Sequence, residues 1–176
     1  MSPRRYTVDP SKGVIEVDWA LFGELSRALA LKVARGSNPE IVIGIATAGV
    51  VPGATVAAIL GLEFHSILVS RRSGVETVRE SPAVLSSAPT EVRGKSVLIV
   101  DETCDSGATM RLARAAVVSA GAEEVWTAVS FRTGSYEPDF HALETDSTIV
   151  LPWDREVLID GELRINPLYA EILDED

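Results

Sequence analysis

This sequence of 176 residues has a single cysteine, Cys104, and two histidines, His65 and His141. One cysteine cannot form a disulfide within the chain, so we expect a reducing, cytoplasmic environment. The two histidines have neither the spacing of a metal site nor that of a catalytic triad, and we expect both to be structural. No apolar stretch preceded by positive charge stands near the N-terminus, so we expect no signal peptide.

Positive charge is also scarce. The chain has 16 Lys and Arg residues against 26 Asp and Glu, which makes the formal net charge −10. This balance argues against a nucleic-acid partner and against a membrane surface, both of which are anionic. Residues 41–62 are uncharged and long enough to span a bilayer, but glycines and Pro52 interrupt them. A strand, a loop and a helix explain that stretch better than a membrane span.

Hydrophobic residues make up 46% of the chain, which indicates one globular domain with a sizeable core. Residues up to Val17 have mixed character and suggest an extended arm. Asp18 can cap a helix that runs to about Ala34, and Gly36 suits the left-handed position that ends it.

The most informative stretch is residues 96–110. Val97–Val100 form an apolar run that predicts a buried strand, and Asp101 and Glu102 follow where that strand ends. A short polar loop then leads into a helix that begins at about Ala108. Open α/β sheets bind ligands at the carboxyl ends of their strands, and a helix N-terminus binds phosphate. Because carboxylates repel phosphate, Asp101 and Glu102 would hold a metal ion or sugar hydroxyls instead.

Residues 97–109 resemble the phosphoribosyl-pyrophosphate (PRPP) binding motif of the type I phosphoribosyltransferases. The resemblance assigns PRPP binding to Asp101, Glu102, Thr103, Cys104, Asp105, Ser106, Gly107, Ala108 and Thr109. It also implies Mg²⁺ as the cofactor, with Asp101 and Glu102 at the metal. The alternative is an ordinary strand–turn–helix whose acidic residues are solvated.

A second loop of small residues follows the expected strand 40–45, and Pro52 suits the first turn of the next helix. In the family the corresponding loop binds pyrophosphate, which here assigns that role to Ala46, Thr47, Ala48 and Gly49. Thr47 stands where the family often has an arginine. The Ala-Thr-Ala-Gly sequence is similar to the version of this loop in orotate phosphoribosyltransferases. A tight turn that needs small residues for packing is the alternative.

Residues 71–88 are polar and charged, and a segment of this kind is either a functional lid or disordered. The family has a mobile hairpin here that closes over PRPP. By resemblance, Arg71 and Arg72 meet the phosphates, with a solvated loop as the alternative.

Asp105 stands where family members that use 6-oxopurines tend to have Asp, and it would accept the purine proton as the catalytic base. Its alternative role is to cap the following helix. The family likewise suggests Phe131, Arg132, Trp153 and Asp154 as base-binding residues. Core packing is the alternative for Phe131 and Trp153, and a surface charge is the alternative for Arg132.

The sequence therefore predicts an α/β fold, a doubly wound and mostly parallel sheet flanked by helices, with a small C-terminal hood. We expect a core at residues 1–134 and a hood at 135–176 within a single domain. The resemblance implies transfer of phosphoribose from PRPP to a 6-oxopurine by a homodimer. A PRPP- or nucleotide-binding regulatory protein on the same fold and an orotate-type enzyme remain the alternatives.

Overall fold

The structure is a computed structural model that describes residues 10–73 and 77–173. The chain forms two compact units: a larger one, Leu25–Thr145, and a smaller one with the described residues up to Glu24 and from Asp146 onward. This division differs from the expected one at both ends. The N-terminal arm groups with the C-terminal segment because the two pair as strands, and residues 140–144 group with the core because they extend its sheet.

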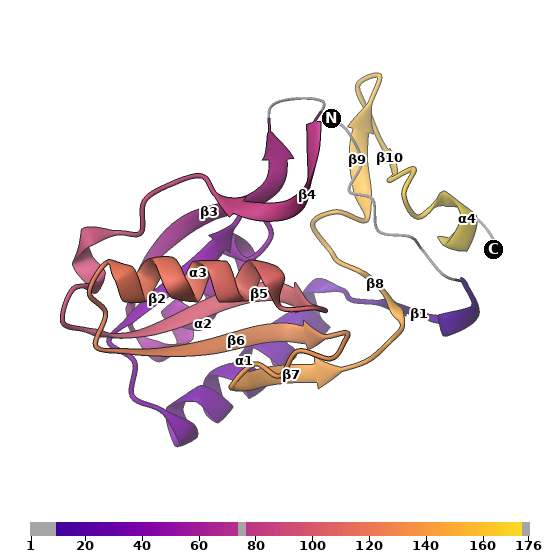
Figure 1. Ribbon diagram of the computed structural model, residues 1–176. Coiled ribbons are helices and arrows are strands. Elements are labelled where there is room, and N and C mark those ends of the chain that lie inside the picture. The colour runs from indigo at the N-terminus through magenta and orange to yellow at the C-terminus, as the bar shows by residue number, and fades with distance from the viewer. Residues whose placement is uncertain (1–9, 74–76, 174–176) are drawn as a thin grey trace. The chain divides into compact units, whose positions relative to one another are not determined.

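The larger unit is built on a six-stranded sheet in the order β4-β3-β2-β5-β6-β7 (Figure 1). Its strands are β2 (Ile41–Ala46), β3 (Glu63–Ser73), β4 (Thr77–Val84), β5 (Ser96–Cys104), β6 (Glu124–Arg132) and β7 (Phe140–Glu144). Neighbouring strands are parallel except for β3 and β4. The chain moves outward from β2 in one direction and from β5 in the other, so the predicted doubly wound sheet is confirmed. The reversal lies between β2 and β5, where such folds bind ligands.

Three helices cover the sheet, with α3 (Ala108–Ser119) on one face (Figure 1). The other face is covered by α2 (Val50–Leu60) and by α1 (Trp19–Gly36) from Leu25 onward. Alternate residues of the buried strands fill the two cores: Ile99 faces α3, whereas Leu98 and Val100 face α1 and α2. This alternation is why strands buried on both faces are almost continuously apolar.

The helix ends follow from local chemistry. Asp18 Oδ1 accepts a hydrogen bond from Leu21 N–H at 2.7 Å, which confirms the expected cap of α1. Gly121 has φ +99° after α3. Gly36, by contrast, is the last residue of α1 and does not adopt a positive φ. A glycine is required there for space, because a Cβ would lie 2.7 Å from the ring of Phe140.

Residues 71–88, expected as a polar lid, include the end of β3 and all of β4, which pair as an antiparallel hairpin with an irregularity between Ser70 and Arg72. A short 3₁₀ turn, η2 (Thr90–Val92), leads into β5. The uncharged stretch 41–62 forms β2 and α2, as predicted. No helix in residues 10–73 and 77–173 is both long and apolar enough to cross a membrane.

The smaller unit pairs the two ends of the chain. Its elements are η1 (Pro10–Lys12), β1 (Val14–Glu16), β8 (Thr148–Val150), β9 (Glu156–Ile159), β10 (Glu162–Ile165) and α4 (Ala170–Leu173). β1 is parallel to β8, and β9 and β10 form an antiparallel hairpin. Of the expected extended arm, Val14–Glu16 form a strand whose backbone groups find partners in β8, and residues 1–9 lie outside the described part of the chain.

Candidate active site

Two loops lie side by side at the carboxyl edge of the sheet. One follows β2 (residues 47–49), and the other, here called the phosphate loop (residues 105–107), follows β5. Gly49 is buried against β5: a Cβ on this residue would lie 2.7 Å from Val100 O and 2.9 Å from Asp101 Cα. The structure therefore brings the predicted pyrophosphate loop against the predicted acidic pair. The peptide bond between Ala46 and Thr47 is cis, and Thr47 is exposed.

The acidic pair lies within β5, near its carboxyl end, and not in a loop. Asp101 is half-buried, and its Oδ1 accepts a hydrogen bond from Glu102 N–H at 2.8 Å. Glu102 is buried, with 2% of its surface exposed. Asp101 is the more accessible of the two.

No group of three or more His, Cys, Asp and Glu residues that could hold a metal occurs in the part of the chain that the structure describes. Magnesium is usually bound by one or two carboxylates together with substrate phosphates and water, not by a complete protein cage. The residues at this edge fit that mode, because Asp101 offers a partly exposed carboxylate beside a loop of small residues.

The phosphate loop leads directly into α3. Asp105 and Ser106 are exposed, and Gly107 occupies the cap position with φ +72°. No side chain caps α3 in the described structure, so Asp105 does not fill the capping role that was its alternative. The first turn of α3 contains no acidic residue. Its N–H groups and the positive end of the helix dipole thus face the phosphate loop, whose only carboxylate is that of Asp105.

Cys104 precedes this loop and is 6% exposed. Burial, together with the nearby Asp101 carboxylate, raises the pKa of its thiol from 9.0 to about 11. The thiol is therefore protonated at neutral pH and acts as a small apolar residue of the core around Ile99 and Met110.

The loop between β6 and β7 (residues 133–139) packs onto the phosphate loop. Thr133 N–H donates to Cys104 O at 2.9 Å, and Tyr136 N–H donates to Asp105 O at 3.1 Å. A Cβ on Gly134 would overlap Oδ1 of Asp105. Tyr136 was not found by sequence reasoning. The sequence did offer one signal: Tyr136 is an aromatic residue that follows Gly134 in the loop directly after β6. That strand pairs with β5, which carries the motif.

Arg132 lies beside Cys104 in the parallel register of β5 and β6. Its guanidinium donates to Tyr136 O at 3.1 Å through Nε, to Glu144 Oε2 at 3.2 Å through Nη1 and to Glu137 Oε1 at 3.4 Å through Nη2. All three nitrogens thus have partners other than a base. The two glutamates are 62% and 81% exposed, so these ion pairs are weak enough to be exchanged.

Phe131 does not reach the site surface. Its side chain is fully buried in β6, so the ring is not available to flank a base, and its expected alternative role in the core is the one observed. Phe131 is buried because its strand is flanked on both sides: it pairs with Thr103 of β5 and with Leu143 of β7.

Trp153 and Asp154 belong to the smaller unit. Trp153 packs edge-on against Phe22 at a centroid distance of 5.0 Å and lies 6.0 Å from Trp19. Asp154 accepts hydrogen bonds at both carboxylate oxygens, from Leu151 N–H at 3.2 Å and from Tyr169 OH at 3.1 Å. Within this unit both residues have structural contacts. Arg71 and Arg72 lie in β3, but their side chains fall outside what the structure describes.

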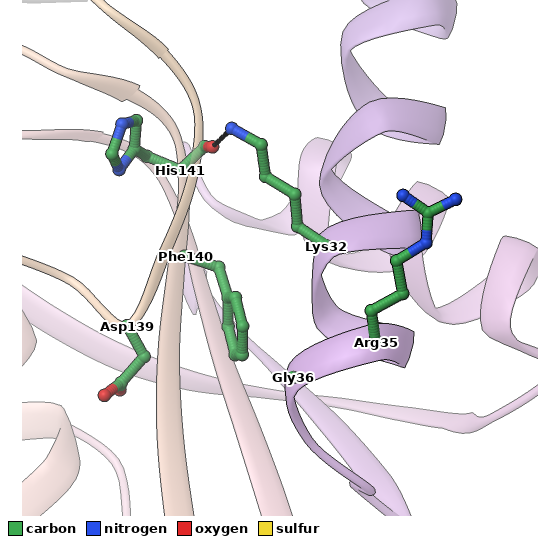
Figure 2. Close-up of a pocket in the computed structure, with 6 residues that line it drawn as sticks. All are labelled: Lys32, Arg35, Gly36, Asp139, Phe140 and His141. Carbon is green, nitrogen blue, oxygen red and sulfur yellow. Dashed lines mark hydrogen bonds between the residues drawn. The ribbon is translucent and has the colours of Figure 1, made fainter.

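A separate cavity of about 370 Å³ is lined by Lys32, Arg35, Gly36, Asp139, Phe140 and His141 (Figure 2). Lys32 Nζ donates to His141 O at 2.7 Å, which joins α1 to the edge strand β7. Since β7 begins at Phe140, this cavity lies at the amino end of the parallel strands, away from the two loops. None of the predicted site residues lines it.

Two loops of small residues thus lie at the switch point of the sheet, and one of them leads into a helix without a side-chain cap. A comparison with known protein families agrees with this arrangement. The pattern of the phosphoribosyl transferase domain family matches residues 17–159. The chain belongs to this family. Membership confirms the resemblance drawn from the motif and accounts for the strand order of the sheet.

Individual relatives are similar over most of the chain. A xanthine-guanine phosphoribosyltransferase of Nitratidesulfovibrio vulgaris is 29% identical over 152 residues, covering 86% of this chain and 91% of that protein. One from Cereibacter sphaeroides is 28% identical and covers 82% of this chain and 89% of that protein. The crystal structure of a purine phosphoribosyltransferase from Pyrococcus horikoshii matches with a TM-score of 0.71 at 27% identity, covering 84% of this chain and 98% of the other.

Proposed function

We propose that this protein transfers the 5-phosphoribosyl group from PRPP to a 6-oxopurine, releasing pyrophosphate and forming a nucleoside monophosphate for purine salvage. The observation that carries the proposal is the phosphate loop, which joins β5 to the uncapped end of α3 beside Asp105. The similarity to relatives named xanthine-guanine phosphoribosyltransferase, over 86% of the chain in one case, supports the choice of base.

In this proposal the phosphate loop binds the 5′-phosphate through its backbone N–H groups and the Ser106 and Thr109 hydroxyls. Residues 46–49 bind the pyrophosphate, and Asp101 and Glu102 hold the ribose hydroxyls. Asp101, as the more exposed carboxylate, would also hold Mg²⁺, which when bound neutralises charge on the leaving pyrophosphate. Asp105 accepts the proton that the purine loses as its nitrogen bonds to the anomeric carbon.

Arg132 is proposed to contact the purine after exchanging an exposed glutamate for the base. Its position next to the phosphate loop supports this role, because its strand is in register with Cys104. We further propose Trp153 and Asp154 as base contacts, and Arg71 and Arg72 as lid residues. A homodimer in the cytoplasm is the proposed working state. Light scattering of the purified chain tests the assembly.

Pyrophosphate release tests the activity directly. The assay combines the protein, PRPP and Mg²⁺ with hypoxanthine, guanine or xanthine, and uses adenine and orotate as comparison bases. We expect release with at least one oxopurine and none with orotate. Release with orotate alone would replace the proposal by the orotate-type activity.

A regulatory protein that binds PRPP or a nucleotide without turnover is the second candidate. Two features favour it: Thr47 supplies no charge to the pyrophosphate loop, and every nitrogen of the Arg132 guanidinium already has a partner. Tight binding of PRPP with no pyrophosphate release from any base in the panel would support this candidate and contradict the enzyme.

A further inference from the structure

The ring of Tyr136 rests directly on Gly107 in the phosphate loop. A Cβ built on Gly107 would lie 2.8 Å from Cε2 of the ring and closer still to Cγ and Cδ2. Gly107 also has φ +72°, which side chains other than glycine rarely adopt. The glycine is thus needed both for its conformation and for the space that Tyr136 fills. Any change in the loop at Gly107 must move this ring.

Arg111 also contacts the Tyr136 ring. Its Cζ lies 5.4 Å from the centroid of the Tyr136 ring, within the range of a cation–π interaction. Its Nη2 donates to Ser106 O at 2.8 Å. One side chain of α3 thus holds both the ring and the backbone of the phosphate loop.

Arg111 carries its positive charge at a place where the dipole of α3 disfavours it. It belongs to the first turn of α3, where the helix dipole favours negative groups, and that turn contains no acidic residue. Arg111 is exposed and points back toward the loop. A phosphate bound at residues 105–107 would turn this unfavourable position into a favourable one, because the arginine and the helix end would then face opposite charge.

The backbone of Tyr136 connects this contact to two other site residues. Its N–H donates to Asp105 O at 3.1 Å, and its carbonyl accepts from Arg132 Nε at 3.1 Å. The ring, the N–H and the carbonyl of one residue therefore each hold a different part of the proposed site.

We infer that Tyr136 and Arg111 are positioning residues that keep the phosphate loop in its anion-binding shape. Tyr136 acts by filling the space above Gly107, and Arg111 by holding Ser106 O and adding positive charge beside a phosphomonoester. The inference rests on the proposed function, since it takes the 5′-phosphate of PRPP as the ligand of this loop. It adds two residues outside the PRPP motif to that site.

Calorimetric binding of ribose 5-phosphate tests the inference without catalysis, because this probe carries only the sugar and the 5′-phosphate. We expect Tyr136→Ala and Arg111→Gln each to weaken its binding about three- to tenfold, as the loss of a cation–π contact and one hydrogen bond implies. Tyr136→Phe should bind as the wild type does, because the contacts use the ring. Magnesium pyrophosphate, which belongs to the other loop, should bind within about twofold of wild type in all variants.

Arg114→Gln is the matched control, since Arg114 is an exposed arginine of the same helix. It should leave ribose 5-phosphate affinity unchanged, whereas Arg111→Gln should also reduce the salt dependence of binding. Equal affinities for the wild type and Arg111→Gln would overturn the role of Arg111. Weakened binding in Tyr136→Phe would show that the hydroxyl and not the ring matters, and an equal loss for magnesium pyrophosphate would show that Tyr136 acts on the fold in general. Either result would overturn the role inferred for the Tyr136 ring.

Failure of the inference is distinguishable from failure of the proposed function. A wild-type protein that binds neither ribose 5-phosphate nor PRPP would remove both. A wild type that binds both, with affinities unchanged in Tyr136→Ala and Arg111→Gln, would remove only the inference. If thermal unfolding shows that Tyr136→Ala does not fold, the comparison of Arg111→Gln with Arg114→Gln decides the inference. Weaker binding of ribose 5-phosphate in Arg111→Gln alone supports it, and equal affinities overturn it.

Discussion

Asp105 is the residue on which the proposed chemistry depends most. Its carboxylate is exposed, does not cap α3, and has its Oδ1 against Gly134 of the neighbouring loop. A carboxylate that holds no helix end is available to accept a proton from a ligand. These surroundings are compatible with its proposed role as the base.

Replacing Asp105 by Asn keeps the size of the side chain and removes the proton acceptor. We expect kcat to fall about 10²- to 10⁴-fold, the usual contribution of a general base, with PRPP affinity within about threefold of wild type. Steady-state kinetics with the preferred oxopurine and calorimetry with PRPP measure the two effects. Equal losses in both quantities would mean that Asp105 shapes the loop and is not the base.

Cys104 illustrates a residue of the motif with a packing role. Its raised pKa of about 11 means that the folded protein binds the thiol proton more tightly than the unfolded chain does. The resulting stabilisation is fully present below pH 9 and is lost as the pH rises toward 11. We expect the native thiol to react with iodoacetamide at pH 8 about a hundredfold more slowly than the thiol of the unfolded protein. Similar rates would contradict the buried, protonated state.

At the scale of elements, the approach of α2 to the sheet depends on small residues. A Cβ on Gly53 would lie 3.0 Å from Gly44 Cα, and one on Gly49 would lie 2.8 Å from Ile45 O. The loop 47–49 reaches Asp101 only because no side chain separates the backbones. Packing thus explains the glycines here, and a ligand is not needed to do so.

Gly49→Ala tests this close packing. The new methyl group must displace backbone at Val100 and Asp101, so we expect the free energy of unfolding to fall by about 1–3 kcal/mol. Denaturant titration measures it. Gly61→Ala is the comparison, because nothing lies within 4 Å of its Cβ position, although φ +68° adds a backbone cost of about 1 kcal/mol. A smaller loss for Gly49→Ala than for Gly61→Ala would contradict the packing argument.

The turn into β7 is held by a reciprocal pair of residues. Asp139 Oδ2 accepts from Thr127 N–H at 2.7 Å and from Thr127 Oγ1 at 2.8 Å, and Asp139 N–H lies 3.1 Å from the same hydroxyl oxygen. Thr127 is 1% exposed, so its N–H has no access to water as an alternative acceptor.

Asp139→Ala should therefore lower the free energy of unfolding by about 1–3 kcal/mol, since it leaves a buried donor unsatisfied. Asp139→Asn retains an acceptor oxygen and should lose less. Thermal or denaturant unfolding of the two variants checks this order. The reverse order, or no loss in Asp139→Ala, would show that the pair does not hold the turn.

At the scale of the whole molecule, magnesium should stabilise the fold only when PRPP is bound. The described residues contain no group of three metal-binding side chains, and Glu102 of the acidic pair is only 2% exposed. Magnesium alone thus has few ligands here, whereas PRPP supplies phosphate oxygens.

We expect PRPP with Mg²⁺, at one hundred times the dissociation constant, to stabilise the folded state by about 2.7 kcal/mol. This corresponds to a rise of about 5–10 °C in the unfolding midpoint for a chain of this size. Mg²⁺ alone should change the midpoint by less than about 1 °C. Differential scanning fluorimetry measures both. A rise with Mg²⁺ alone as large as that with PRPP would indicate a metal site built by the protein itself.

The sequence determined the strands, helices and loops of the larger unit that carry strong local signals. The apolar runs before Asp101 and Ala46, the Asp18 cap and the glycine after α3 all depend on residues close in the chain. The family also followed from one local motif. These features depend on hydrophobic period and cap chemistry, which neighbouring residues alone decide.

The tertiary structure decided what depends on residues far apart in the chain. Pairing of β1 with β8 moved the N-terminal arm into the smaller unit, and the register of β6 buried Phe131 in the core. Only the fold places Tyr136 on Gly107 and the guanidinium of Arg132 between two glutamates. Strand pairing and side-chain packing join positions whose separation no local pattern encodes, so these contacts had to be seen in three dimensions.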